Sequence, residues 1–177
     1  MSKRINIVEY NPSWPKLFSK EEHRIRCSLG DLILDIEHIG STAVKGLAAK
    51  PVIDVMVAIR KASDVSTCIR LLTQAGFEYA LEHEAILSDR LYFRRHVNNV
   101  RICNLHLVNR DSAVWSDLLL FRDYLRTHPD EASTYANLKR ELAQQEWSDG
   151  IEYAVAKTEY VELILKAAAE AQRAIEK

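Results

Sequence analysis

The chain has 177 residues, and its 24 Lys and Arg nearly balance its 25 Asp and Glu, so the formal net charge is −1 at pH 7. A composition of 47% hydrophobic and 28% charged residues is typical of a globular protein and excludes a disordered tail, a collagen-like fibre and a coiled-coil rod. The length favours one domain over residues 1–177. Balanced charge provides no global field for duplex nucleic acid or an anionic membrane, so neither is an expected partner.

Cysteine usage and the lengths of apolar runs indicate where such a protein resides. Cys27, Cys68 and Cys103 lie far apart and form no C-x-x-C pair. No apolar run approaches the length of a membrane-spanning helix, and the first residues do not have the pattern of a secretory leader. These features predict a soluble protein of the reducing cytoplasm.

Hydropathy patterns predict a mixed sheet with helices in the first 110 residues. Strands are expected over residues 5–9, 32–39, 51–59, 90–97 and 100–108. A turn at 11–15 leads into a helix that ends near Gly30, and a second helix is expected over 62–75. Asn98 and Asn99 tolerate the positive φ of a tight turn, so the last two strands are predicted to form a hairpin.

The remainder of the chain is predicted to be helical. One helix is expected over about 112–127, a second from Pro129, and a third from about Gly150 to the end. A mixed sheet followed by a helical portion predicts an α+β fold with helices flanking the sheet.

The segment over residues 38–57 carries the pattern with the most chemistry. A strand ends at Gly40 and Ser41, where glycine permits close approach of a ligand to the backbone, the serine adds a hydroxyl, and Lys50 adds positive charge. Asp54 interrupts the apolar run that follows, although carboxylates are seldom buried without a partner. Asp54 and Met56 share one face of the strand, and we expect this face to look toward whatever Gly40 and Ser41 bind.

This arrangement resembles the nucleotidyltransferase signature, in which Gly-Ser is followed downstream by Asp-x-Asp on a strand. Over most of its length the chain is also similar to the GrpB (glutamate-rich protein B) family. The resemblance is carried by Trp14, the block 38–51, Asp54, the blocks 105–108, 121–126 and 138–139, and Lys157. Related sequences occur fused to dephospho-coenzyme A kinase.

The resemblance implies a nucleotidyltransferase-like fold and a divalent-cation cofactor, Mg²⁺ or Mn²⁺. In that superfamily the serine and backbone hold a nucleotide, and strand carboxylates bind two metal ions. Here Asp54 would be the metal ligand, but Met56 stands at the second carboxylate position, and a thioether does not coordinate Mg²⁺. The strand expected to supply a third carboxylate has Asn104 and His106 instead. The sequence therefore predicts an incomplete metal site.

Several side chains are candidates for roles at this site. The catalytic candidates are Asp54 and His106, and the candidates for binding a ligand or its phosphate are His38, Gly40, Ser41, Lys50 and Lys139. An imidazole at position 106 would serve as a general acid or base, or else be a satisfied core histidine.

Other charged residues of the C-terminal part have structural interpretations. Lys139 is either a phosphate contact across the cleft or a solvated lysine. Arg122 and Arg126 are expected to form a surface or capping network, and Lys157 belongs to a stripe whose main role is helix packing.

Two functions of different classes remain open at this point. The first is a protein that binds a nucleotide or another phosphate-bearing small molecule at the Gly-Ser turn, with nucleotidyl transfer as its potential reaction. The second is a non-catalytic accessory or binding module linked to coenzyme A metabolism. RNA binding through Arg94, Arg95, His96 and Arg101 is the weakest hypothesis. If Asp54 holds a metal or a ligand, Asp54→Asn abolishes binding and leaves thermal stability near that of the wild type.

Overall fold

The computed structural model describes residues 3–83, 87, 89–147 and 150–175. Its α-helices are α1 (Trp14–Leu29), α2 (Val65–Gln74), α3 (Ala113–Thr127), α4 (Pro129–Leu142), α5 (Gly150–Val155) and α6 (Thr158–Ile175). Its strands are β1 (Lys3–Arg4), β2 (Ile33–Ile39), β3 (Ile53–Ile59), β4 (Glu78–Tyr79), β5 (Leu91–Val97), β6 (Val100–Asn109) and β7 (Glu146–Trp147). None of the helices in these ranges combines the length and apolar character needed to cross a membrane.

The central sheet has five strands in the order β2-β3-β6-β5-β4. The β3–β6 pair is parallel, and the other pairs are antiparallel. This mixed sheet with flanking helices confirms the predicted α+β class. The parallel register sets Asp54 opposite Asn104 and Met56 opposite His106, so the polar residues of two strands that are distant in sequence share one face.

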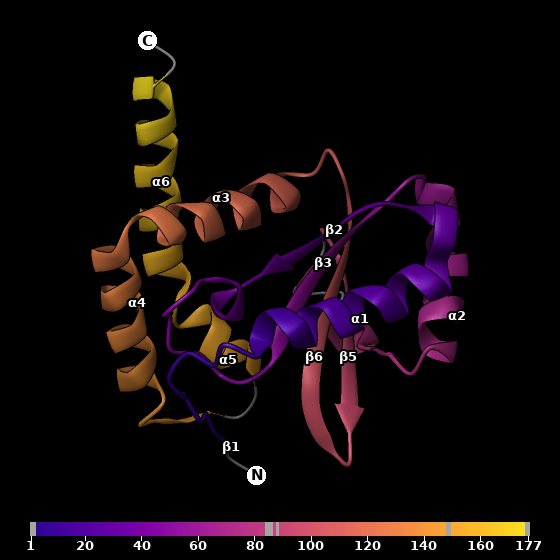
Figure 1. Ribbon diagram of the computed structural model, residues 1–177, viewed down its shortest axis with the longest axis horizontal. Coiled ribbons are helices and arrows are strands. Elements are labelled where there is room, and N and C mark those ends of the chain that lie inside the picture. Colours follow the sequence, from indigo (N-terminus) through magenta and orange to yellow (C-terminus); the bar gives the residue numbers. More distant parts are fainter. Residues whose placement is uncertain (1–2, 84–86, 88, 148–149, 176–177) are drawn as a thin grey trace.

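One face of the sheet carries the largest part of the core, beneath α1 and α2. Val55 and Val57 of β3 belong to one buried cluster with Ile25 of α1 and Leu72 of α2. In Figure 1, α1 crosses in front of the strands and α2 lies beyond its C-terminal end. Alternation along β3 directs these valines away from the face that holds Asp54.

The opposite face of the sheet is only partly apolar, and α3 covers that part. Met56 and Ala58 of β3 pack in a cluster with Ile39 of β2 and Trp115 of α3. Asp54 lies on the same face of β3, next in the alternation toward the start of the strand. One end of this face therefore makes a hydrophobic contact with α3, and the other end is polar.

The segment that follows the Gly-Ser turn is enclosed by the C-terminal helices. Val44 and Leu47 pack in a third buried cluster with Phe121 of α3, Tyr135 of α4 and Ile164 of α6. Figure 1 shows α3, α4 and α6 gathered at the side of the molecule away from α2. The C-terminal helices therefore fix the position of the turn relative to the sheet.

The structure differs from the sequence-based expectations at several elements. Residues 5–9 do not form the predicted strand: Val8 makes only an isolated antiparallel bridge with Ala49, and the short strand β1 lies earlier and pairs with β7. The third C-terminal helix is divided into α5 and α6. The predicted hairpin is confirmed, because Asn98 and Asn99 both have positive φ.

The expectation of a surface network for Arg122 is wrong, since this residue is only 7% exposed. Its guanidinium donates to the Glu37 carboxylate, at 2.5 Å, and to the His38 carbonyl, at 2.9 Å, and so ties α3 to β2. It also donates to both carboxylate oxygens of the neighbouring Asp123. Arg126 is a capping residue as expected, because it donates to the Ala43 carbonyl.

We predict that Arg122→Met lowers the free energy of unfolding by about 2–3 kcal/mol, the usual range for lost hydrogen bonds to charged groups. Arg126→Met is the matched control on the same helix, and its side chain is 41% exposed. Its expected cost is about 1 kcal/mol. Urea denaturation measures both, and equal costs would contradict the role assigned to Arg122.

Candidate functional site

The Gly40–Ser41 turn lies directly against the Asp54 carboxylate. A Cβ added at Gly40 would lie 2.5 Å from Asp54 Oδ2, closer than nonbonded atoms approach. Gly40 has φ 70° and ψ −173°, a region of backbone space that is essentially restricted to glycine. Two independent constraints thus require glycine here. The structure places the Gly40–Ser41 turn next to Asp54 of β3, as the strand alternation predicts.

Asp54 is held by one direct side-chain partner from the neighbouring strand. Asn104 Nδ2 donates to Asp54 Oδ1 at 2.8 Å, across the parallel pair of β3 and β6. Burial raises the pKa of Asp54, while the Asn104 hydrogen bond and the charges of Lys157 and Lys50 act in the opposite direction. Asn104 was not among the candidate residues, because only the register of strands far apart in sequence places it opposite Asp54.

Lys139 of α4 fixes the other side of the turn. The residue is 2% exposed, and its ammonium donates to Ser41 Oγ at 2.9 Å and to the Ala48 carbonyl. It also lies 4.7 Å from the centre of the Tyr135 ring. Burial, followed by repulsion from Lys157 and Arg140, lowers the pKa of Lys139 to about 7. Lys139 is therefore a buried cation of the site and not a solvated lysine.

Two further lysines approach the same carboxylate. Lys157 lies between α5 and α6, with its ammonium 4.4 Å from the centre of the Tyr153 ring. Burial lowers the pKa of Lys157 to about 8, the Asp54 charge opposes this shift, and the Lys50 charge adds to it. The sequence pattern predicts that Lys157 takes part mainly in helix packing. In the structure its charge also interacts with that of Asp54.

His38 belongs to the support of the turn. Its ring stacks on Phe18 with centres 4.6 Å apart, and its Nε2 hydrogen-bonds with the Thr42 hydroxyl at 3.0 Å. Burial, with the nearby positive charges of Arg126 and Arg122, lowers the pKa of His38 to about 4. The imidazole is therefore neutral at pH 7, and a direct contact with ligand stays a prediction.

His106 lies one step further along the polar face than Asn104. It pairs with Met56 across the strands, and its ring packs on Tyr92 with centres 5.1 Å apart. Burial, aided by Arg90, lowers the pKa of His106 to about 3, so the ring is neutral at physiological pH. Its Nδ1 has no hydrogen-bond partner among the described residues. A catalytic role for His106 stays a prediction.

The side chains around Asp54 do not fit a two-metal centre. Met56 is 0% exposed within the cluster beneath α3, and the neighbouring position on β6 is an amide that donates to Asp54. Across the described ranges, no group of three or more His, Cys, Asp or Glu side chains could hold a metal ion. Two Mg²⁺ ions need several hard oxygen ligands, whereas this carboxylate is surrounded by an amide and lysines.

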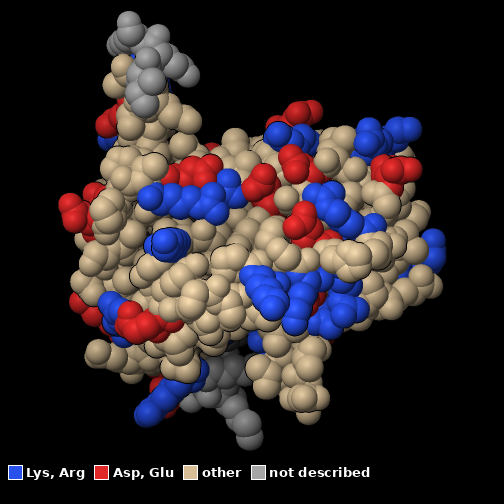
Figure 2. All heavy atoms as spheres, in the orientation of Figure 1, with Lys and Arg blue, Asp and Glu red and all other residues tan. Residues whose placement is uncertain are grey.

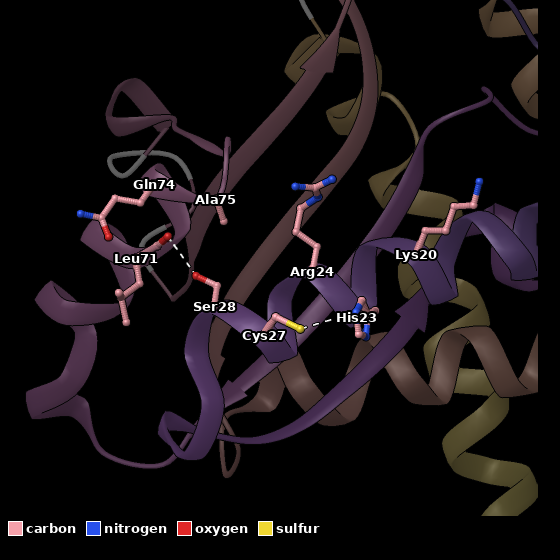
Figure 3. A pocket seen from close by; sticks show the side chains of 8 residues that line it. All are labelled: Lys20, His23, Arg24, Cys27, Ser28, Leu71, Gln74 and Ala75. Atoms are coloured by element: carbon pink, nitrogen blue, oxygen red, sulfur yellow. Dashed lines mark hydrogen bonds between the residues drawn. The ribbon is translucent and has the colours of Figure 1, made fainter.

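A hollow of about 570 Å³ lies between α1 and α2, on the other side of the sheet (Figure 3). Its lining includes Arg24, Cys27 and Ser28 of α1 and Leu71 of α2. Ser28 donates to the Leu71 carbonyl at 3.0 Å, and Cys27 Sγ lies 3.6 Å from His23 Nε2. None of the predicted site residues lines this hollow, so we place the candidate site at Gly40 and Asp54.

A family model described as GrpB protein matches residues 4–167. The chain belongs to the GrpB family. It is similar to a UPF0157 protein of Halalkalibacterium halodurans, with 37% identity over 164 residues that cover 93% of this chain and 82% of that protein. The crystal structure of conserved protein GrpB from Enterococcus faecalis matches with a TM-score of 0.82 and 34% identity, over 94% of this chain and 99% of the other.

A more distant similarity joins this GrpB-family chain to part of a longer enzyme. A dephospho-CoA kinase of Mycolicibacterium paratuberculosis is 26% identical over 166 residues, which cover 80% of this chain and 40% of that protein. Together, these matches confirm the predicted family, and the crystal structure also agrees with the α+β fold.

The contact between Gly40 and Asp54 makes a quantitative prediction. Gly40→Ala is expected to lower the free energy of unfolding by about 2–4 kcal/mol, because it adds both backbone strain and overlap with the carboxylate. Gly46→Ala is the matched control, since Gly46 also has positive φ but has open space around the added Cβ. It should cost about 1–2 kcal/mol. Urea denaturation compares the two, and an equal loss would show that Asp54 does not press on the turn.

The buried lysines predict how stability depends on pH. Lys139 and Lys157 titrate at about 7 and about 8 in the folded chain and near 10.5 when unfolded. Between these values the unfolded chain binds more protons, so the free energy of unfolding rises with pH. Lys157→Met removes the part of this rise that lies between about pH 8 and about pH 10.5.

The matched control for the pH experiment is Lys166→Met, on the exposed surface of α6. This variant should keep the full pH dependence of the wild type. Urea denaturation at each pH makes the comparison, and an unchanged slope in Lys157→Met would refute the assignment of a buried charge to Lys157.

Proposed function

We propose that this GrpB-family chain binds a nucleotide or another phosphate-bearing small molecule at the Gly40–Ser41 turn, beside Asp54. The observation that carries the proposal is that the Gly40–Ser41 turn lies against the Asp54 carboxylate and receives the Lys139 ammonium at Ser41 Oγ. The charges of Lys50 and Lys157 also act on Asp54.

The balance of charge at the site supports an anionic ligand. Burial is the main cause of the lowered pKa of Lys139 and of Lys157. The charge of Lys157 lowers the pKa of Lys139 further, and the charge of Lys50 does the same to Lys157. Asp54 carries at most one negative charge, and that charge acts on both lysines. Burying an excess of one sign is costly unless an opposite charge enters, and a phosphate group carries that charge. The ligand should therefore stabilise the folded chain.

The Ser41 hydroxyl is oriented to take part in binding. An ammonium group only donates hydrogen bonds, so Ser41 Oγ accepts from Lys139 and keeps its own proton available. Ser41 donates this proton to the Tyr135 hydroxyl oxygen, because their hydrogen bond acts to lower the pKa of Tyr135. On binding, this proton would turn from Tyr135 toward a phosphate oxygen beside the turn.

The same geometry supports binding over nucleotidyl transfer. Transfer by the two-metal route needs several carboxylates to hold two cations at the reacting phosphorus. Asp54 is accompanied by Asn104 and Met56 at the corresponding strand positions, and neither supplies a carboxylate. We therefore propose a binding role and assign no transfer step.

A coenzyme A-related ligand is the second candidate. The similarity to about two fifths of a dephospho-CoA kinase favours it, because that enzyme acts on a phosphate-bearing ligand with an adenosine group. Under this alternative the chain is an accessory module of coenzyme A metabolism. Coenzyme A and dephospho-coenzyme A therefore belong in the same binding experiment as ATP and inorganic pyrophosphate.

Nucleic acid is not favoured as the ligand. The basic hairpin of β5 and β6 uses its arginines within the chain: Arg94 lies 2.6 Å from Glu82, and Arg95 lies 3.0 Å from Glu21 of α1. Figure 2 shows Lys and Arg side chains gathered near α1 with acidic side chains close by. Paired charges of this kind release few counterions on binding a phosphate backbone.

The proposal is tested by isothermal titration of the full chain with inorganic pyrophosphate, ATP, coenzyme A and dephospho-coenzyme A. We expect at least one of them to bind, and Ser41→Ala to weaken that binding by about tenfold, which corresponds to one hydrogen bond to a charged group. Ser28→Ala, in the hollow between α1 and α2, is the control and should bind as the wild type does. Absence of binding by all four compounds refutes the proposal, and loss of binding in the Ser28 variant would move the site to that hollow.

A further inference from the structure

The environment of Asp54 differs from that of a metal ligand in the direction of its hydrogen bond. Asn104 donates a hydrogen bond from its amide nitrogen to Asp54 Oδ1. A hydrogen-bond donor therefore stands where a bound cation would need a further oxygen ligand. Asn104 Oδ1, the atom that would coordinate Mg²⁺, has no hydrogen-bond partner among the described residues. The Asn104 amide therefore stabilises the Asp54 carboxylate by donation and offers it no shared cation ligand.

Positive charge at this position comes from side chains. Lys157 and Lys50 both lie close enough for their charges to act on Asp54. The Lys157 ammonium is held over the Tyr153 ring, which favours a cation at that point. Met56 cannot assist a metal ion, because it is buried against α3. The positive charge beside Asp54 therefore comes from lysine side chains of the chain itself.

We propose that the site binds its phosphate-bearing ligand as the free anion, without a divalent cation, and that the Lys157 ammonium bridges Asp54 and a phosphate group of the ligand. The inference rests on the proposed function and specifies the ionic form of the ligand. Asp54 contacts no metal in this arrangement, and its own negative charge opposes the ligand.

This arrangement reverses the expectation for the substitution Asp54→Asn. If a metal bridged Asp54 and the phosphate, the amide would abolish binding. If lysines bind the anion, removing the negative charge of Asp54 also removes its repulsion of the ligand, so the affinity should rise. The amide keeps the size and shape of the side chain, so the comparison isolates charge.

The experiment measures binding of inorganic pyrophosphate to the full chain by isothermal titration, once with excess EDTA and once with excess magnesium or manganese chloride. A buffer near pH 7 keeps Lys157, whose pKa is about 8, in its protonated form. We expect binding in EDTA at least as tight as binding with metal, since the metal complexes free pyrophosphate. Lys157→Met should weaken binding in EDTA by about tenfold or more, Lys166→Met should leave it unchanged, and Asp54→Asn should tighten it.

Each other outcome refutes a defined part of the account. Binding that requires magnesium or manganese, or that Asp54→Asn abolishes, overturns the metal-free inference and leaves the proposed phosphate site intact. Binding in EDTA that survives Lys157→Met overturns the role of Lys157. No binding of pyrophosphate in either buffer, together with no binding of ATP, coenzyme A or dephospho-coenzyme A, refutes the proposed function itself. Circular dichroism of each variant, and Lys157→Gln as a second substitution, separate loss of binding from loss of folding.

Discussion

The contact between Gly40 and the Asp54 carboxylate is the constraint on which the rest of the site depends. It joins the end of β2 to the start of β3 at a separation that no side chain at position 40 would permit. With the turn in this place, Ser41 meets Lys139 of α4, and the chain that follows enters the cluster formed by α3, α4 and α6. The C-terminal helices can then deliver lysines to a carboxylate that lies on a strand.

The buried charged groups of the site lower the stability of the folded chain. Burial disfavours the charged form of Asp54, Lys139 and Lys157, and the lysines also repel one another. Proteins retain such groups where function requires them, and perturbed pKa values of this kind gather at functional sites. An anionic ligand would relieve the repulsion, so that binding and stability are linked through the same charges.

Much of the site was predictable from local pattern. The alternation of β3 places Asp54 on the face away from the valines, and the small residues at Gly40 and Ser41 indicate a turn beside it. Asn104 and Lys157 were not predictable in the same way. Asn104 depends on the register of a parallel pair whose partners are 50 positions apart in the sequence, and Lys157 depends on how the helices pack. Local sequence carries neither kind of information.

The errors in the fold have similar causes. Residues 5–9 have strand-like composition, but Val8 finds its only backbone partner at Ala49, so no ladder forms. Arginine is usually a surface residue, yet Arg122 is buried because the Glu37 carboxylate and the His38 carbonyl accept hydrogen bonds from its guanidinium. In both cases partners distant in sequence decide the outcome.

A crystal structure of the chain with pyrophosphate, grown in the presence of EDTA, would locate the anion and show whether a metal ion accompanies it. We expect phosphate density within hydrogen-bond distance of Lys157 Nζ and Ser41 Oγ, with Gly40 still against Asp54. Density for the anion in the hollow between α1 and α2, or a metal ion retained between Asp54 and the phosphate, would contradict this expectation.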